Sequence, residues 1–342
     1  MEQAVPVYIL SGFLGSGKTT LLYRLLDYWK SQRKRPAIIM NELGEVNLEG
    51  LLVEETVPMA EMLGGCICCS SRGDLSTELA TLIKKESPDV VIIEATGAAN
   101  PLEIVDAVTE TSLYLKVELK SLITVVDAAH LLELYRSQQG ATYRLMQEQI
   151  RCASVLVLNK TDRVSPEEGE EVQAVLRKWN HYAAIMPAVR CNVEPQELID
   201  QSGGILNADD EETDFEADPI APARSVEGEE PHRYHHTHDH VMAYTHYFKR
   251  PVDSVEFENF VNGLPRDVYR AKGIVTFSDT SSRYLFQFAY RESDFMKITP
   301  QGDVPDVAVF IGEHFSSGEI RNQLLKLEKR LLSRPGSIKR SL

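Results

Sequence analysis

Three cysteines lie within four residues of this sequence, at Cys66, Cys68 and Cys69, directly after two glycines. Thiolates bind soft or borderline ions such as zinc and copper(I), and the glycines allow the backbone to turn the three sulfurs towards one point. A tetrahedral zinc needs four donors, so this loop leaves a place for a variable fourth ligand. The pattern therefore favours a site that loads and releases metal over a permanent structural site. A redox pair and a packed cysteine cluster are the alternatives.

A phosphate-binding pattern comes earlier, where residues 12–19 read GFLGSGKT. The apolar run 5–10 predicts a buried strand before the loop and 18–31 predicts a helix after it, which is the context that the motif requires. Backbone N–H groups of such a loop surround a β-phosphate, Lys18 adds a positive charge and the Thr19 hydroxyl can bind magnesium. A glycine-rich turn without a ligand is the alternative. The nucleotide-binding residues predicted here are Gly12, Phe13, Leu14, Gly15, Ser16, Gly17, Lys18, Thr19 and Thr20.

The base is indicated by a second motif, in which the apolar run 154–158 is followed by Asn159, Lys160, Thr161 and Asp162. A carboxylate at the last position can accept both the N1 and N2 protons of guanine, whereas adenine carries an acceptor at N1. Because a polar group left unpaired in a binding site is costly, the site favours GTP over ATP. We predict that Asn159, Lys160 and Asp162 bind the nucleotide. A strand that merely ends in polar residues is the alternative.

Acidic residues follow two other predicted strands. Glu94 ends the run 89–94, where a carboxylate can hold magnesium through water or orient the attacking water, although a turn or capping acid also fits. Residues 41–47 read NELGEVN and lie where a loop that senses the γ-phosphate is expected. Their carboxylates could face magnesium, the other metal or solvent, and Glu42 is the candidate fourth ligand of the cysteine loop. The catalytic residues predicted here are Lys18, Thr19 and Glu94.

Length and composition limit the class of protein. A chain of 342 residues suits two domains, and 43% hydrophobic residues can form a full core. The net charge of -15 argues against a nucleic-acid partner, and the absence of an apolar stretch of about 18 residues argues against a membrane partner. Crowded cysteines favour a reducing compartment, so we expect a cytoplasmic protein. Cys152 and Cys191 are isolated and are interpreted as small buried hydrophobes.

An acidic stretch separates two regions with regular patterns. Residues 205–235 contain ten acidic residues against two arginines and show no apolar periodicity, which predicts a linker. We therefore expect a nucleotide-binding domain over 1–204, a linker over 205–240 and a second domain over 241–342. Histidines in the linker could gather zinc, cobalt or nickel weakly, or could simply be solvated. They are His235, His236, His238 and His240, whereas His246 has the aromatic neighbours of a strand.

The first region predicts a mostly parallel, doubly wound α/β sheet, because continuous apolar runs alternate with helical patterns. The strands are expected at 5–10, 36–40, 89–94, 121–126, 154–158 and 184–189, and the helices near 18–31, 73–86, 129–138, 142–151 and 166–178. Ligands of such sheets bind at the carboxyl ends of the strands. The second region predicts a smaller open α/β sandwich, with a helix capped by Asp253, strands at 272–278, 284–290 and 307–312, and a final amphipathic helix. That last helix either packs on its own sheet or docks a client.

Several motifs together resemble the CobW-type metallochaperone GTPases, which are related to the urease and hydrogenase accessory GTPases. The motifs are the P-loop, NELGE at 41–45, GCICC at 65–69, EATG at 94–97 with Asn100-Pro101, VDA at 126–128 and NKTD at 159–162. The resemblance implies a magnesium-dependent GTPase that binds zinc or another divalent ion at the cysteine loop and delivers it to a client metalloenzyme. It also implies a CobW-type C-terminal domain, to which 241–342 is similar through Arg250-Pro251 and Arg270-Ala271-Lys272-Gly273.

Two other functions remain open at this point. The protein could be a zinc buffer or sensor whose GTPase domain gates a protein-protein contact. It could also be a P-loop kinase of a small substrate, although the guanine motif and the lack of an arginine-rich lid argue against this. The sequence identifies neither the metal nor the client, and it leaves the oligomeric state open, a homodimer included.

Overall fold

The computed structural model describes residues 4–40, 57–61, 72–137, 140–204, 241–280, 282–300 and 304–330. The predicted zinc and auxiliary metal ligands and the predicted linker lie outside the described residues; these ligands are Glu42, Cys66, Cys68, Cys69, His235, His236, His238 and His240. In the described part of the chain, no helix is both long and apolar enough to cross a membrane.

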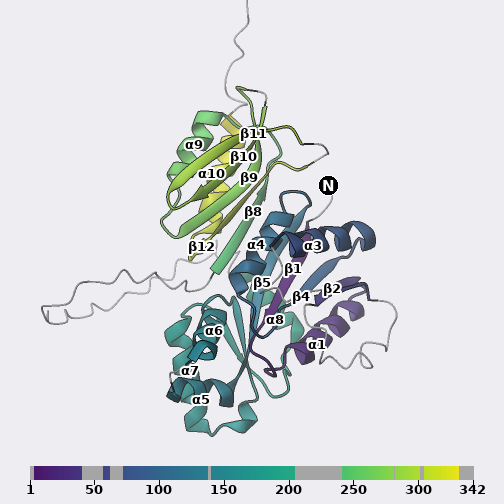
Figure 1. Cartoon of the computed structure of the whole chain (residues 1–342), viewed down its shortest axis with the longest axis vertical. Coiled ribbons are helices and arrows are strands. Elements are labelled where there is room, and N and C mark those ends of the chain that lie inside the picture. Colours follow the sequence, from purple (N-terminus) through teal and green to yellow (C-terminus); the bar gives the residue numbers. More distant parts are fainter. Residues whose placement is uncertain are drawn as a thin grey trace, which may run out of the picture.

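A seven-stranded sheet forms the core of the first domain, with the strand order β3-β2-β4-β1-β5-β6-β7. Its strands β2, β4, β1 and β5 are labelled in Figure 1. Every neighbouring pair in it is parallel, which confirms the predicted α/β class. The strands are β1 (Val5–Ser11), β2 (Pro36–Met40), β3 (Met59–Glu61), β4 (Val90–Glu94), β5 (Val117–Asp127), β6 (Val155–Asn159) and β7 (Ala184–Pro187). β3 was not predicted, because three residues are too few to show a period.

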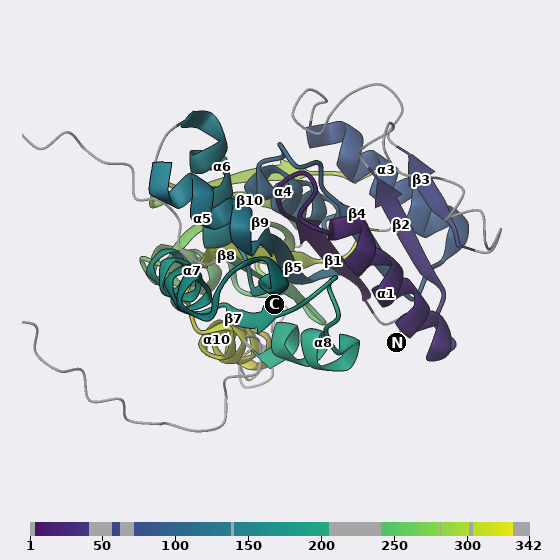
Figure 2. The ribbon, with the colours of Figure 1, turned by 90° about the horizontal axis from the view of Figure 1, so that it is seen from below.

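Helices cover both faces of this sheet (Figure 2). α1 (Lys18–Ser31) and α8 (Pro195–Gly204) pack on one face, where Leu21, Leu25 and Leu198 are fully buried. The opposite face carries α3 (Arg72–Glu86), α4 (Pro101–Thr111), α5 (Ala128–Ser137), α6 (Gly140–Arg151) and α7 (Pro166–Trp179). The sequence prediction omitted α4 and α8.

Capping explains where two of these helices begin. The side chain of Asn100 accepts a hydrogen bond from the N–H of Leu102, and Pro101 occupies the first turn of α4. Ser165 and Glu168 form a reciprocal capping box at the start of α7, which satisfies N–H groups that the helix cannot bond internally. The Asn-Pro pair of α4 was therefore a helix-start signal present in the sequence.

The second domain is a five-stranded antiparallel sheet with the order β11-β10-β9-β12-β8. Its elements are β8 (Val241–Tyr247), α9 (Ser254–Asn262), β9 (Val268–Phe277), β10 (Ser282–Ala289), β11 (Glu292–Ile298), β12 (Val307–Glu313) and α10 (Ser317–Arg330). Asp253 caps α9, as predicted, by accepting hydrogen bonds from the N–H groups of Val255 and Glu256. The buried face of α10 packs on its own sheet through Ile320 and Leu324. His246 is buried in β8, as its neighbours indicated.

The uncovered face of the second sheet packs on the first domain. One hydrophobic cluster includes Val117 of β5 together with Val307 and Val309 of β12. The Tyr247 hydroxyl lies 2.7 Å from the main-chain nitrogen of Val117 and 2.8 Å from its carbonyl oxygen. In addition, one guanidinium nitrogen of Arg270 lies 2.8 and 2.7 Å from the two carboxylate oxygens of Asp106 on α4. Apolar packing and a charge-assisted hydrogen bond therefore both join the two domains.

Candidate nucleotide site

The loop between β1 and α1 depends on glycine at three positions. Gly12, Gly15 and Gly17 have φ angles of 132, 71 and 116°, which side chains with a Cβ rarely adopt. A Cβ at Gly12 would lie 2.2 Å from the carbonyl oxygen of Val125, so the loop passes directly over β5. The glycines thus allow a tight turn against the sheet, immediately before the N-terminus of a helix.

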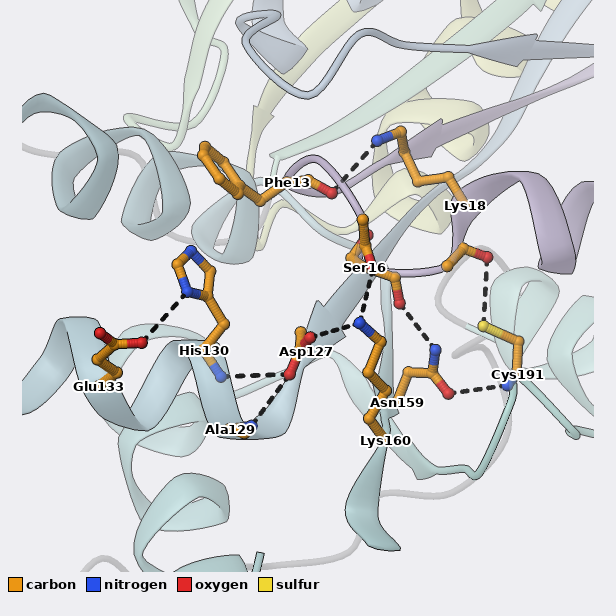
Figure 3. Close-up of polar contacts among 12 residues, drawn as sticks. Phe13, Ser16, Lys18, Asp127, Ala129, His130, Glu133, Asn159, Lys160 and Cys191 are labelled. Atoms are coloured by element: carbon orange, nitrogen blue, oxygen red, sulfur yellow. Dashed lines mark hydrogen bonds and ion pairs between the residues drawn. The ribbon is translucent and has the colours of Figure 1, made fainter. Parts of the chain in front are cut away.

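Side chains on both sides of this loop donate hydrogen bonds to its carbonyl oxygens (Figure 3). The Lys18 ammonium lies 2.9 Å from the carbonyl oxygen of Gly12 and 3.3 Å from that of Phe13. Three further carbonyl oxygens accept hydrogen bonds, those of Gly15 from Lys160 at 2.8 Å, of Ser16 from Asn159 at 2.7 Å and of Gly17 from the Cys191 thiol at 3.3 Å. With these oxygens engaged, an anion in the loop would meet N–H groups rather than lone pairs.

Two oxygen donors meet at the first turn of α1. The Thr19 hydroxyl donates a hydrogen bond of 2.9 Å to Glu94, which ends β4 and is buried. The parallel register pairs Leu10 of β1 with Glu94, so the carboxylate lies beside the strand that enters the P-loop. A hydroxyl and a carboxylate are hard ligands of the kind that magnesium prefers, and such an ion often keeps several waters. The pair therefore fits a magnesium ion bound together with phosphates.

The predicted base-binding residues follow β6. Asn159 is buried, whereas Lys160 has a φ of 60° and begins the 3-10 helix η1 (Thr161–Arg163). The Lys160 ammonium pairs with Asp127 at 2.6 Å, and Asp127 in turn caps α5 by accepting from the N–H groups of Ala129 and His130. Asp162 is exposed, so its carboxylate is accessible to a base. Lys160 therefore ties together the P-loop, the end of β5 and the base motif.

The loop after β7 completes this network, and the sequence prediction did not assign it a role. Asn159 accepts a hydrogen bond of 2.8 Å from the N–H of Cys191, whose side chain is fully buried against Gly17. Arg24 of α1 donates to Asn192 at 2.9 Å. Cys191 is buried as predicted, but its thiol also holds the P-loop. Its position in the loop after the strand that follows the Asn-Lys-Thr-Asp motif was the available signal.

Comparison with known protein families identifies the chain. The profile of the CobW/HypB/UreG nucleotide-binding domain matches residues 6–187, and the profile of the cobalamin synthesis protein CobW C-terminal domain matches residues 241–328. The chain belongs to the CobW/HypB/UreG family. The resemblance inferred from the motifs is thereby confirmed.

Three relatives of this CobW/HypB/UreG protein align with different shares of the chain. It is 34% identical over 172 residues to the zinc chaperone YeiR of Escherichia coli (strain K12), an alignment that covers 50% of each chain. It is 30% identical over 231 residues to zinc-regulated GTPase metalloprotein activator 1 of Dictyostelium discoideum, covering 58% of this chain and 48% of the relative. These two alignments span about half the length of the relatives. A third relative, the zinc chaperone YjiA of Escherichia coli, is 28% identical over 341 residues, with 95% and 99% covered.

In this CobW/HypB/UreG protein, the two segments that carry the predicted metal ligands follow β2 and β3, at one edge of the sheet. Met40, which precedes the 41–47 segment, pairs with Glu94 on one side and with Glu61 on the other. Glu61 in turn ends β3, five residues before Cys66. Among the described residues, no three His, Cys, Asp or Glu side chains gather as a metal site. β2, from which the 41–47 segment leaves, thus lies next to Glu94, and β3, which leads to the cysteines, lies one strand further out.

Cys191 is expected to resist alkylation in the folded protein. Burial raises the pKa of its thiol to about 11, against the opposing influence of Arg24 and Lys160. At neutral pH the group is therefore a thiol, which is not the nucleophilic form. Under native conditions, iodoacetamide should leave Cys191 unmodified in peptide mass spectra, and unfolding in guanidinium should expose it. Rapid native modification of Cys191 would contradict the buried contact with Gly17.

Proposed function

We propose that this protein is a GTP-hydrolysing metallochaperone of the cytoplasm. In this proposal, it binds GTP and magnesium at the P-loop, binds zinc at Cys66, Cys68 and Cys69, and transfers the zinc to a client metalloenzyme. Glu42 is proposed as the fourth ligand and the linker histidines as auxiliary ligands. The names of the relatives, zinc chaperone and zinc-regulated GTPase metalloprotein activator, support this assignment.

The observation that carries the proposal is the edge of the sheet around Glu94. There Glu94 contacts Thr19 of the P-loop, and its strand is the direct neighbour of β2, from which the 41–47 segment leaves. β3, which leads to the cysteines, is the next strand. A magnesium ion at Thr19 and Glu94 would therefore lie two strands away from the start of the cysteine loop.

This arrangement suits nucleotide control of metal binding. We propose that GTP and magnesium set the conformation of the 41–47 segment, and that hydrolysis changes the geometry of the cysteine loop or its docking to a client. Coupling between two binding sites is reciprocal, so zinc must alter nucleotide affinity by the factor by which nucleotide alters zinc affinity. Differences of about 10-fold are typical of such coupling.

Zinc affinity measured by chelator competition tests the proposal directly. We expect affinities that differ by about 10-fold between the forms bound to a GTP analogue and to GDP. Replacement of Cys66, Cys68 and Cys69 by serine should remove one tight zinc per chain in elemental analysis. Zinc held equally tightly in every nucleotide state, with no transfer to any apo-enzyme, would instead indicate a zinc buffer or sensor.

A further inference from the structure

A fully buried amide lies beneath the loop that follows Glu94. Gln149 of α6 has no exposed surface, and its side-chain nitrogen donates to the carbonyl oxygen of Gly97 at 3.1 Å and approaches that of Ala99 at 3.5 Å. Its own main-chain carbonyl accepts a hydrogen bond of 2.9 Å from the Thr124 hydroxyl, which fixes this point of α6 to β5. Gln149 thus connects a rigid part of the core to the turn between β4 and α4.

The orientation of this amide follows from its partners. An oxygen turned towards the carbonyls of Gly97 and Ala99 would face two other oxygens, so the amino group must point at them. The amide oxygen is then buried without a hydrogen-bond partner among the described residues. Buried polar atoms are rarely left in this state, because water would bind them in the unfolded chain. A buried glutamine with an unpaired amide oxygen is less stable than an apolar side chain of the same size would be, which points to a role other than stability.

Gly97, whose carbonyl accepts from Gln149, also packs directly against the P-loop. A Cβ at Gly97 would lie 2.6 Å from the main-chain nitrogen of Leu14 and 3.1 Å from its Cα. The turn is therefore in close contact with the P-loop on one side and hydrogen-bonded to Gln149 on the other. Glu94, which contacts Thr19, lies three residues before Gly97 in the same segment.

We infer that Gln149 is a positioning residue for GTP hydrolysis, an inference that rests on the proposed GTPase activity. It holds the 95–99 turn against the P-loop, so that Glu94 and the turn meet the γ-phosphate and the attacking water in the reactive arrangement. In the proposed function the nucleotide is bound by Lys18, the loop N–H groups and the base motif, and other contacts hold these groups in place. Gln149 therefore affects the chemical step more than binding, because small displacements of reacting groups cost rate.

Gln149→Met removes the donor while keeping a side chain of similar length. We expect kcat for GTP to fall about 10-fold, since even a 1 Å misplacement can cost more than this. The KM for GTP and the Kd for GDP should stay within about twofold, because the lost interaction acts in the transition state. Steady-state hydrolysis and GDP titration give these values.

Gln149→Glu supplies a second measurement, which also serves if the methionine variant does not fold. Burial and the two facing carbonyls favour the neutral acid, so this carboxyl would have a raised pKa and, when protonated, would donate one hydrogen bond. Its kcat should be partly retained at low pH and should fall as the pH rises through the raised pKa. The wild-type profile should lack this loss.

Asn180 is the matched control, because it is also a fully buried amide. Its nitrogen donates to the carbonyls of Ile150 at 2.8 Å and Ala153 at 2.9 Å, which lie at the C-terminal end of α6 and just after it rather than in the 95–99 turn, so this variant reports the effect of loosening α6 itself. Asn180→Leu should lower the thermal midpoint but leave kcat unchanged well below that midpoint. A wild-type kcat in Gln149→Met, or an equal kcat loss in both variants, would overturn the inference. A wild-type protein that hydrolyses no GTP would instead refute the proposed function.

Discussion

Lys18→Ala should reduce kcat/KM for GTP hydrolysis by about 1,000-fold, the scale on which a single charge-stabilising donor acts in phosphoryl or acyl transfer. The Lys18 ammonium is nearly buried and lies over the P-loop, bonded to the carbonyls of Gly12 and Phe13. From this position its charge can meet a β- or γ-phosphate bound in the loop. Alanine removes that charge without altering the glycines that form the turn.

The fold should survive this substitution. Removing Lys18 costs its charge-assisted hydrogen bonds to main-chain oxygens, each worth about 2 kcal/mol, but it also relieves the desolvation of a buried ammonium, which offsets much of that loss. Circular dichroism and the thermal midpoint should therefore stay close to wild type. Lys34→Ala, at an exposed position just after α1, removes the same charge from the surface and should leave hydrolysis unchanged. A Lys18→Ala protein that hydrolyses GTP at the original rate would remove the nucleotide site from this loop.

The parts of the site that could be predicted are those that local sequence determines. The P-loop is a strand, a glycine-rich turn and a helix in one continuous stretch. The spacing of the motif places its glycines where the turn requires a positive φ. Asn159 and Glu94 were placed correctly at strand ends, because continuous apolar runs of five residues that alternate with helices indicate parallel strands. Carboxyl ends of parallel strands lie along one edge, so these residues were expected near each other.

The residues that could not be predicted act through contacts between distant segments. Gln149 sits in an ordinary amphipathic pattern beside Met146 and Ile150, and nothing local shows that it is fully buried. From the sequence, Cys191 could be any small buried residue; only the structure shows that its sulfur lies against Gly17 of the P-loop. A side chain whose partners lie more than 50 positions away carries no periodic or capping signal in its own neighbourhood.

The second domain illustrates the same limit. The Arg270-Ala271-Lys272-Gly273 motif supported the resemblance, but its role was not visible in the sequence. In the structure, Arg270 pairs with Asp106 of the first domain, and a Cβ at Gly273 would lie 2.1 Å from the carbonyl oxygen of Val307. One end of the motif thus fixes the domain interface, and the other allows β9 and β12 to approach closely. Both functions are structural, which is why they do not identify a client.

Asp162→Asn should change the base that the protein accepts. Asp162 is exposed in η1, where the left-handed Lys160 turns the chain away from β6. Its carboxylate can accept the N1 and N2 protons of guanine, whereas an asparagine amide would place a donor against the N2 amino group. We expect kcat/KM for GTP to fall about 100-fold, since a mismatched donor leaves polar groups unpaired. Xanthosine triphosphate should be hydrolysed instead, because its 2-oxo group accepts from the new amide and its N1 proton is donated to the amide oxygen.

Hydrolysis assays with GTP, ATP and xanthosine triphosphate measure this exchange. The matched control is Glu170→Gln on α7, which removes one negative charge from an exposed position nearby and should leave the preference for GTP unchanged. A uniform loss with all three nucleotides would show that Asp162 supports the loop rather than the base. An unchanged preference for GTP would place guanine recognition elsewhere, and the loop around Cys191 and Asn192, which Asn159 and Arg24 hold beside the P-loop, would then be the next segment to test.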